Sequence, residues 1–272
     1  MIGGTIMEPQ QFYLICAYVL AALLGLCVGS FLNVVIYRLP NGMNMSKPAS
    51  HCTTCNYTLK WYDNIPVLSY IFLGGRCRKC KQRISPRYMI VELVNGILWV
   101  LCVLLFWEKS PFYAVIAALV LSVLICVFFI DLEHMLIHNR FVVIISLLGI
   151  AAIFLDPYAG VRWYDHLIGA AVFGGGFLLI YYGAIWILKR EGMGFGDVKL
   201  ALAAGLLLGW QRMLLAMIIA AISASIILLI VRRVKGDEKN HEYPFGPFIA
   251  VGIAISLLVG GPAIDWYLGL LH

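Results

Sequence analysis

Long apolar segments separated by short polar ones extend along almost the whole chain. A helix needs about 20 mostly apolar residues to cross the hydrocarbon core of a bilayer. Eight segments fit such helices, although the fourth and the sixth are short: residues 12–37, 88–107, 111–130, 141–155, 166–188, 198–210, 213–231 and 245–270. The pattern predicts an all-α polytopic membrane protein with about eight transmembrane helices, or seven if residues 198–210 form a short or re-entrant helix.

The composition agrees with this class. Of the 272 residues, 62% are hydrophobic and 12% are charged, whereas about 25% of the residues of a soluble domain are charged. Ordinary soluble, disordered and fibrous proteins are therefore excluded. The apolar composition makes membrane lipid a predicted partner. Nucleic acid is not a predicted partner, because the basic residues build no amphipathic recognition helix.

Lysine and arginine are distributed unevenly between the predicted loops. When the helices alternate in direction, 17 of the 20 basic residues fall on one side of the membrane, and Lys109, Arg162 and Arg212 fall on the other. Loops rich in Lys and Arg remain in the cytoplasm. The pattern therefore places the long loop 38–87 in the cytoplasm and both termini outside it. It divides the chain into a first transmembrane helix (1–37), a cytoplasmic loop domain (38–87) and a multi-helix membrane domain (88–272).

Four cysteines of the loop domain form two C-x2-C pairs separated by 21 residues: Cys52, Cys55, Cys77 and Cys80. Two such pairs can give four thiolates to one tetrahedral zinc ion. The loop is too small to bury a core, so a metal would supply its folding energy, and a β-hairpin would fill the space between the pairs. Four protein ligands leave no open position, which predicts a structural Zn²⁺. The alternative is four reduced cysteines without a metal.

Acidic residues near membrane helices are costly and indicate function. Four of them lie at the predicted cytoplasmic ends of helices: Glu92, Asp131, Glu133 and Asp197. Asp131 follows one apolar segment and Asp197 precedes another, so both can reach one poorly hydrated pocket. Two carboxylates in such a pocket share one proton, as in aspartic proteases, where one activates water and the other polarises the peptide carbonyl. Glycines at 192, 194 and 196 allow close backbone approach and positive φ angles.

Simpler roles for these residues remain open. Asp131 could be an interfacial helix cap, and Asp197 could be the N-cap of the following helix. Glu92 is expected to pair with a loop arginine. His134 and His138 have the spacing of a metal pair on one helix, but no third ligand accompanies them.

Several segments resemble one known family. Gly194-Phe-Gly196-Asp197 is a GxGD motif, and residues 192–200 resemble the second active-site motif of bacterial type IV prepilin peptidases. Residues 129–139 resemble the first motif of that family. Further similarity is found in residues 29–40, 63–70, 84–92 and 243–248, so the resemblance extends from about residue 25 to about residue 260. The chain departs from the family pattern at Thr53 and His138, where the family commonly has proline.

The resemblance implies a bifunctional enzyme of the bacterial inner membrane. Such an enzyme cleaves the basic leader of type IV prepilins or pseudopilins after a glycine, at the cytoplasmic face, and methylates the new N-terminal residue with S-adenosylmethionine. Asp131 and Asp197 would be the catalytic pair of this GxGD aspartic protease, and the four loop cysteines would bind metal. The resemblance assigns no residues to the S-adenosylmethionine site, and it does not indicate the oligomeric state.

Two other classes of protein fit some of the same features. A proton-coupled membrane transporter with a zinc-binding loop also places acids near glycine-broken helices. It needs access from both faces, whereas the acids here are predicted at one face. A membrane scaffold with a zinc loop and no catalytic activity is the third alternative.

Overall fold

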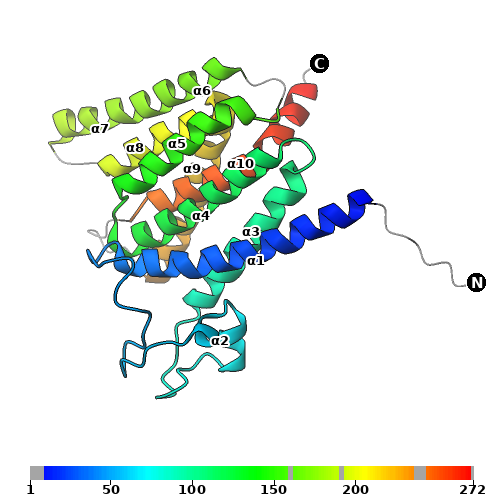
Figure 1. Cartoon of the computed structure of the whole chain (residues 1–272). Coiled ribbons are helices and arrows are strands. Elements are labelled where there is room, and N and C mark those ends of the chain that lie inside the picture. Colours follow the sequence, from blue (N-terminus) through cyan, green and yellow to red (C-terminus); the bar gives the residue numbers. More distant parts are fainter. Residues whose placement is uncertain (1–8, 159–161, 190–192, 236–242, 271–272) are drawn as a thin grey trace, which may run out of the picture. The chain divides into compact units, whose positions relative to one another are not determined.

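The computed structural model describes residues 9–158, 162–189, 193–235 and 243–270 (Figure 1). All eight apolar segments of the sequence are helical, which confirms the all-α membrane fold class. The helices are α1 (Pro9–Arg38), α2 (Leu68–Phe72), α3 (Arg87–Phe106), α4 (Pro111–His134), α5 (Asn139–Leu155), α6 (Trp163–Gly169), α7 (Gly175–Leu188), α8 (Phe195–Leu208), α9 (Trp210–Lys235) and α10 (Gly246–Gly269), with a 3-10 turn η1 (Trp61–Asn64) and a π-helical turn η2 (Ala170–Gly174).

Six continuous helical segments in the described residues are long and apolar enough to cross a membrane. They correspond to α1, α3, α4, the continuous α6–η2–α7 segment, α9 and α10. The remaining two apolar segments form α5, with 17 residues, and α8, with 14. A helix of 14 residues is about 21 Å long, which is shorter than the hydrocarbon core of a bilayer. Protein must therefore surround at least one end of α8.

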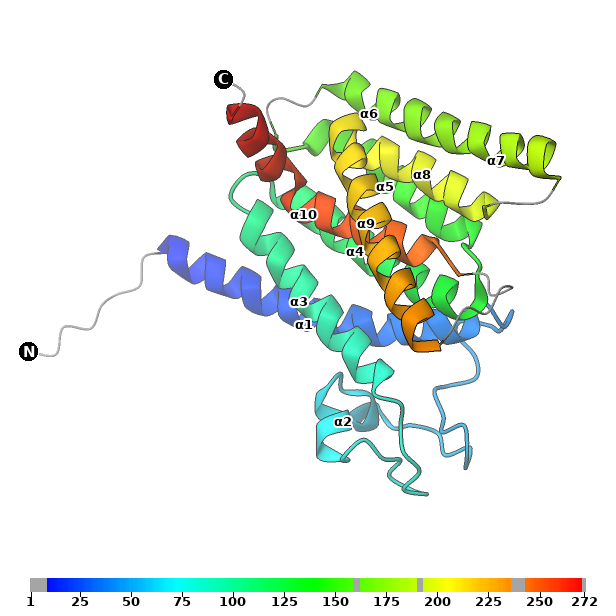
Figure 2. The same cartoon turned by 180° about the vertical axis from the view of Figure 1, so that it is seen from behind.

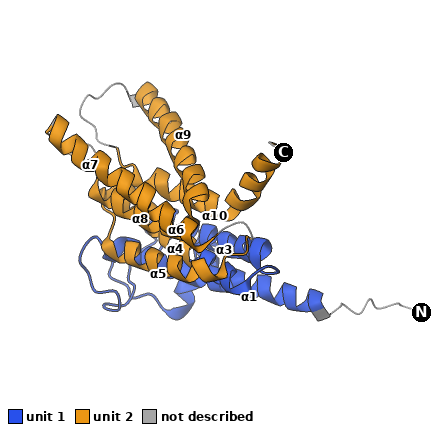
Figure 3. Cartoon of the chain, turned by 90° about the horizontal axis from the view of Figure 1, so that it is seen from above, with its two compact units in different colours: residues 1–118 blue, residues 119–272 orange. Residues whose placement is uncertain are grey.

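The chain divides into two compact units, residues 1–118 and 119–272, and the boundary lies within α4 (Figure 3). In the first unit α1 runs beside α3 (Figure 1). Glycines allow the two backbones to approach closely, since a Cβ atom on Gly29 would lie 2.7 Å from the Cα atom of Glu92. Asn95 ties the pair together by donating to the carbonyl oxygen of Gly25 at 2.6 Å.

In the second unit α8 is the central helix (Figure 2). It contacts α5, α6, η2, α7, α9 and α10, and nine of its 14 residues are buried. Gly205 of α8 meets Gly169 of α6 with no side chain between the two backbones. Such close contact between small residues is typical of helices packed in membranes. The fold therefore surrounds α8 with other helices of the second unit.

Candidate active site and metal centre

Asp131 lies in the last turn of α4, because that helix continues to His134, beyond the end of the apolar run. The residue is only 5% exposed. The backbone amide of Gly246, at the start of α10, interacts with its carboxylate. Oδ2 of the same carboxylate has no hydrogen-bond partner among the described residues. A buried acceptor without a partner is uncommon and indicates a functional group.

Asp197 lies in the first turn of α8 and is 7% exposed. Gly194 is the N-cap residue, and its carbonyl oxygen accepts the backbone N–H of Asp197 at 3.0 Å. The N-terminus of a helix carries partial positive charge, which favours a carboxylate there. The charge of Asp131 acts on Asp197, so the two side chains lie within electrostatic reach of each other. The structure thus brings together the two acids that the sequence singled out.

Ile137, in the turn between α4 and α5, packs beside this pair. A Cβ atom on Gly196 would lie 2.9 Å from Cβ of Ile137, and one on Gly246 would lie 3.0 Å from its Cδ1. The same Cβ atom on Gly246 would lie 2.5 Å from Oδ2 of Asp131. The glycines are therefore needed for close packing around the carboxylates.

The two described glycines of this motif do not use the positive φ angles that glycine allows. Gly194 has φ −66°, and Gly196 is not among the residues with positive φ. Gly192 lies outside the described residues.

No basic group among the described residues pairs with either of the two carboxylates. In the described part of the chain, no ion pair involves Asp131 or Asp197. The nearby Lys199 donates to Oδ1 of Asn139 at 2.9 Å and lies over the ring of Phe195. The site is therefore a buried pair of acids that has no counter-ion in the described part of the chain.

The other candidate polar residues have different surroundings. His134 ends α4 whereas His138 caps α5, so the two histidines do not share a helix face. Glu133 and His134 are exposed. The carboxylate of Glu92 accepts the backbone N–H of Val67 at 2.7 Å and the hydroxyl of Ser30. It was expected to pair with a loop arginine, but no ion pair with Glu92 is found among the described residues.

The four loop cysteines converge on one point. The Sγ atoms of Cys52, Cys55, Cys77 and Cys80 all lie within 4.8 Å of one another, and they form the only such ligand cluster among the described residues. Cys52 and Cys80 are 3.8 Å apart, and Cys55 and Cys77 are 3.9 Å apart. A tetrahedral zinc ion with Zn–S bonds of about 2.3 Å requires sulfur–sulfur distances of about 3.8 Å. The cluster could therefore hold this metal.

The two cysteine pairs adopt the same backbone geometry. In each pair the first cysteine accepts a backbone N–H from the residue four positions later, Asn56 or Lys81, at 2.9 and 3.0 Å. Both of these residues have positive φ. The segment between the pairs contains η1 and α2, so the predicted β-hairpin was wrong. This segment is helical because backbone N–H groups of Leu68–Phe72 donate to the carbonyl oxygens of residues 65–67.

Hydrogen bonds organise the charges of the loop. The backbone amides of Cys55 and Thr54 lower the pKa of the Cys52 thiol to about 6, which favours the metal-binding thiolate. Burial opposes ionisation of Asp63, but donors from Arg78, Lys60 and Tyr57 lower the pKa of this carboxyl below its usual value. Nε of Arg78 donates to Oδ1 of Asp63 at 2.6 Å. This contact ties the second cysteine pair to η1.

Comparison with known proteins decides the family. The model of the bacterial peptidase A24 N-terminal domain matches residues 23–106, and the model of the type IV leader peptidase family matches residues 118–229. A prepilin leader peptidase/N-methyltransferase of Aeromonas salmonicida is 33% identical, over 92% of this chain and 93% of the relative. The chain belongs to the type IV leader peptidase family. This membership confirms the predicted peptidase class and leaves a transporter or an inert scaffold without support.

Two more relatives of this leader peptidase carry the same name. The Pseudomonas aeruginosa protein is 33% identical over 93% of this chain and 94% of its own length. The Myxococcus xanthus protein is 38% identical over 82% of this chain and 67% of its own length. No solved structure matches the chain.

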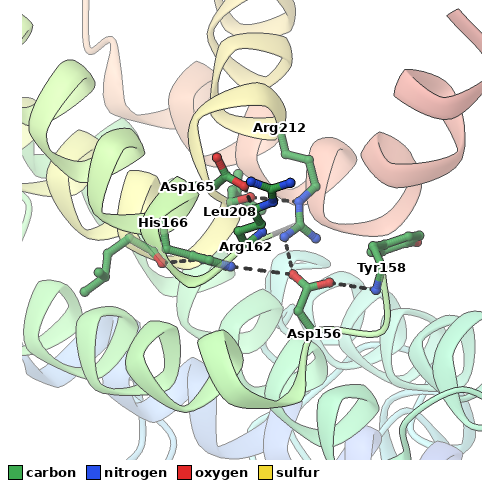
Figure 4. A network of polar contacts seen from close by, with 8 residues as sticks. Asp156, Tyr158, Arg162, Asp165, His166, Leu208 and Arg212 are labelled. Atoms are coloured by element: carbon green, nitrogen blue, oxygen red, sulfur yellow. Dashed lines mark hydrogen bonds and ion pairs between the residues drawn. The ribbon is translucent and has the colours of Figure 1, made fainter. Parts of the chain in front are cut away.

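Another polar cluster in this leader peptidase surrounds the far end of α8 (Figure 4). Arg212 is 2% exposed, pairs with Asp156 and donates through Nε to the carbonyl oxygen of Leu208 at 2.7 Å. Nδ1 of His166 donates to the carbonyl oxygen of Leu206 at 2.9 Å, and its Nε2 lies 3.9 Å from Asp156. Buried carbonyl groups at the end of a helix require such donors. The cluster therefore caps the helix that carries Asp197 at its other end.

Sequence reasoning missed two features of these sites. Arg212 was placed only on the extracytoplasmic side, and its burial was not foreseen. It is buried in the first turn of α9, because Gly209 is the sole residue between α8 and α9. Gly246 was not proposed as a site residue, although it belongs to the segment 243–248 on which the family resemblance partly depended.

Proposed function

We propose that this protein is a GxGD-type aspartic endopeptidase that removes the leader of type IV prepilins or pseudopilins by cutting after a glycine. The observation that carries the proposal is the pair of buried carboxylates, Asp131 and Asp197, which no basic group pairs with among the residues that the structure describes. The family supports the same substrate class, because the relatives described above are named prepilin leader peptidases. No metal is needed for this chemistry.

The pair is proposed to act through a shared proton. Two like charges in a poorly hydrated site are not both ionised cheaply, so the pair retains one proton. The ionised carboxylate takes a proton from water as the water oxygen attacks the scissile carbonyl carbon. The protonated carboxylate donates a hydrogen bond to the carbonyl oxygen and later gives a proton to the leaving amine. The peptide bond breaks, and the products are a free carboxylate and a new N-terminal amine.

We infer that the active site faces the cytoplasm of a bacterium and that the protein lies in the inner membrane. Of the 20 Lys and Arg residues, 17 were assigned to one side and three to the other. Asp131, at the end of α4, and Asp197, at the start of α8, both belong to that basic side in this topology. The same topology divides the chain into a first transmembrane helix (1–37), a cytoplasmic loop domain (38–87) and a multi-helix membrane domain (88–272), and this division is part of the proposal.

The cysteine cluster is proposed to bind one structural zinc ion. Its four sulfur atoms match the size of a tetrahedral site, and they leave no position for a substrate. S-adenosylmethionine would supply the methyl group for N-methylation of the product, as the names of the relatives suggest. We assign no residues to its site.

Product analysis tests the proposal. The purified protein is incubated in detergent with a full-length prepilin and S-adenosylmethionine, and the products are analysed by mass spectrometry. We expect a single cut after glycine and one added methyl group on the new N-terminus. Cleavage without the methyl group would remove the methyltransferase half of the proposal. An intact prepilin, with the enzyme shown to be folded, would contradict both halves.

A further inference from the structure

Helix α2 presents an exposed apolar face. Leu68, Ile71 and Phe72 have the i, i+3, i+4 spacing of one helix face and are 51%, 59% and 84% exposed. Trp61 lies in the adjacent turn η1, which contacts α2, and is 80% exposed. Large apolar side chains gathered on a surface indicate an interaction site.

The structure holds α2 beside the ends of two membrane helices. The backbone N–H of Val67, immediately before α2, donates to Glu92 of α3, which also accepts the hydroxyl of Ser30 of α1. Glu92 is the sixth residue of α3, so this contact lies about 8 Å along the axis from the first residue of the helix. Val67 has φ 60°, which is unfavourable for a β-branched residue. The contact therefore fixes α2 at the level of the membrane helices, next to the start of α3 (Figure 1).

The rest of the loop is strongly basic. Residues 38–87 contain nine Lys and Arg residues and one acid, Asp63. Arg78 pairs with that acid. The other basic side chains around the second cysteine pair are exposed: Arg76, Lys79, Lys81 and Arg83. Apolar and basic side chains on one segment next to a bilayer are typical of interfacial anchors that bind anionic lipid.

We propose that α2 and Trp61 form an interfacial anchor, whose apolar face enters the boundary between headgroups and acyl chains while the basic residues bind anionic phospholipid. A basic prepilin leader is a poor occupant of this surface, because like charges repel. The anchor fixes the cysteine loop against the membrane. The proposal rests on the membrane topology and does not depend on the peptidase activity.

Photo-cross-linking tests the anchor in the full-length protein. Benzoylphenylalanine replaces Phe72, or Leu68 on the same face, and the protein is reconstituted into nanodiscs of phosphatidylethanolamine and phosphatidylglycerol. Thr53 is the matched control, because it is an exposed polar residue of the same loop. We expect several-fold more phospholipid adduct at positions 68 and 72 than at position 53, with phosphatidylglycerol enriched above its share in the disc.

The outcomes separate the occupants of the surface. Equal lipid adducts at positions 72 and 53, or adducts to a second copy of the chain, would overturn the anchor. Adducts without enrichment of phosphatidylglycerol would overturn the assignment of the anionic headgroup. In a variant with Arg76, Lys79, Lys81 and Arg83 changed to Gln, the enrichment should disappear while the adduct at position 72 persists. Prepilin cleavage is measured separately on the same samples, so failure of the peptidase proposal leaves this result interpretable.

Discussion

Arg212 is the residue whose replacement should destabilise the helical bundle most, because it caps α8 from a buried position. Arg212→Met keeps a long apolar side chain but leaves Asp156 without its cation. Removing one partner of a buried ion pair typically costs about 3–5 kcal/mol. Asp156 retains the backbone N–H of Tyr158, at 3.0 Å, and lies 3.9 Å from Nε2 of His166. We therefore expect the lower end, a loss of about 3 kcal/mol in the free energy of unfolding.

The assay is unfolding by sodium dodecyl sulfate in dodecyl maltoside micelles, followed by tryptophan fluorescence. Arg233→Met is the matched control, because Arg233 is an exposed arginine of the same helix, and its loss should stay within about 0.5 kcal/mol. The double change Arg212→Met/Asp156→Leu should recover most of the stability, since no buried charge is then unpaired. A loss at Arg212 no larger than that of the control would refute the reasoning, as would a double variant less stable than Arg212→Met alone.

Three further predictions concern the loop and the active site. Hydrogen exchange of the loop measures how much more stable the wild-type loop is than the loop of Asp63→Asn. This difference in stability should be constant above about pH 5 and should disappear as the pH falls through the lowered pKa of Asp63. Elemental analysis should find one zinc per chain, and Cys52→Ser should lose it and reduce methylation more than cleavage. Gly246→Ala should abolish cleavage, because its Cβ atom would lie 2.5 Å from Oδ2 of Asp131, whereas Gly183→Ala, with nothing within 4 Å, should not.

The helices of this fold could be predicted from the sequence because a membrane helix needs only a long apolar run. The eight apolar segments are the eight main helices, with bounds that differ by a few residues. The differences occur where polar residues continue a helix. α4, for example, extends through Asp131 to His134, since backbone hydrogen bonding does not stop where the apolar run ends. The cysteine cluster was also predictable, because its ligands follow a short repeated spacing.

Contacts between distant segments were not predictable in the same way. Gly246 approaches Asp131 through the packing of α10 against the bundle, and no local pattern records that contact. Arg212 looks like a loop charge in the sequence, because only its partners Asp156 and Leu208 make its burial tolerable. The apolar spacing of α2 extends over only five residues, too few to predict a helix, and the contact of Val67 with Glu92 holds the helix in place.

The central claim is that Asp131 and Asp197 act as one catalytic unit, and single-turnover cleavage of a prepilin by their asparagine variants tests it most directly. Asparagine has nearly the size of aspartate but cannot hold the shared proton. Asp131→Asn and Asp197→Asn should each lose nearly all cleavage, the double variant should lose little more, and Glu133→Gln, two residues from Asp131, should cleave like wild type. Substantial cleavage by folded Asp131→Asn would contradict the account, and loss of cleavage in Glu133→Gln would identify Glu133 as the acid in its place.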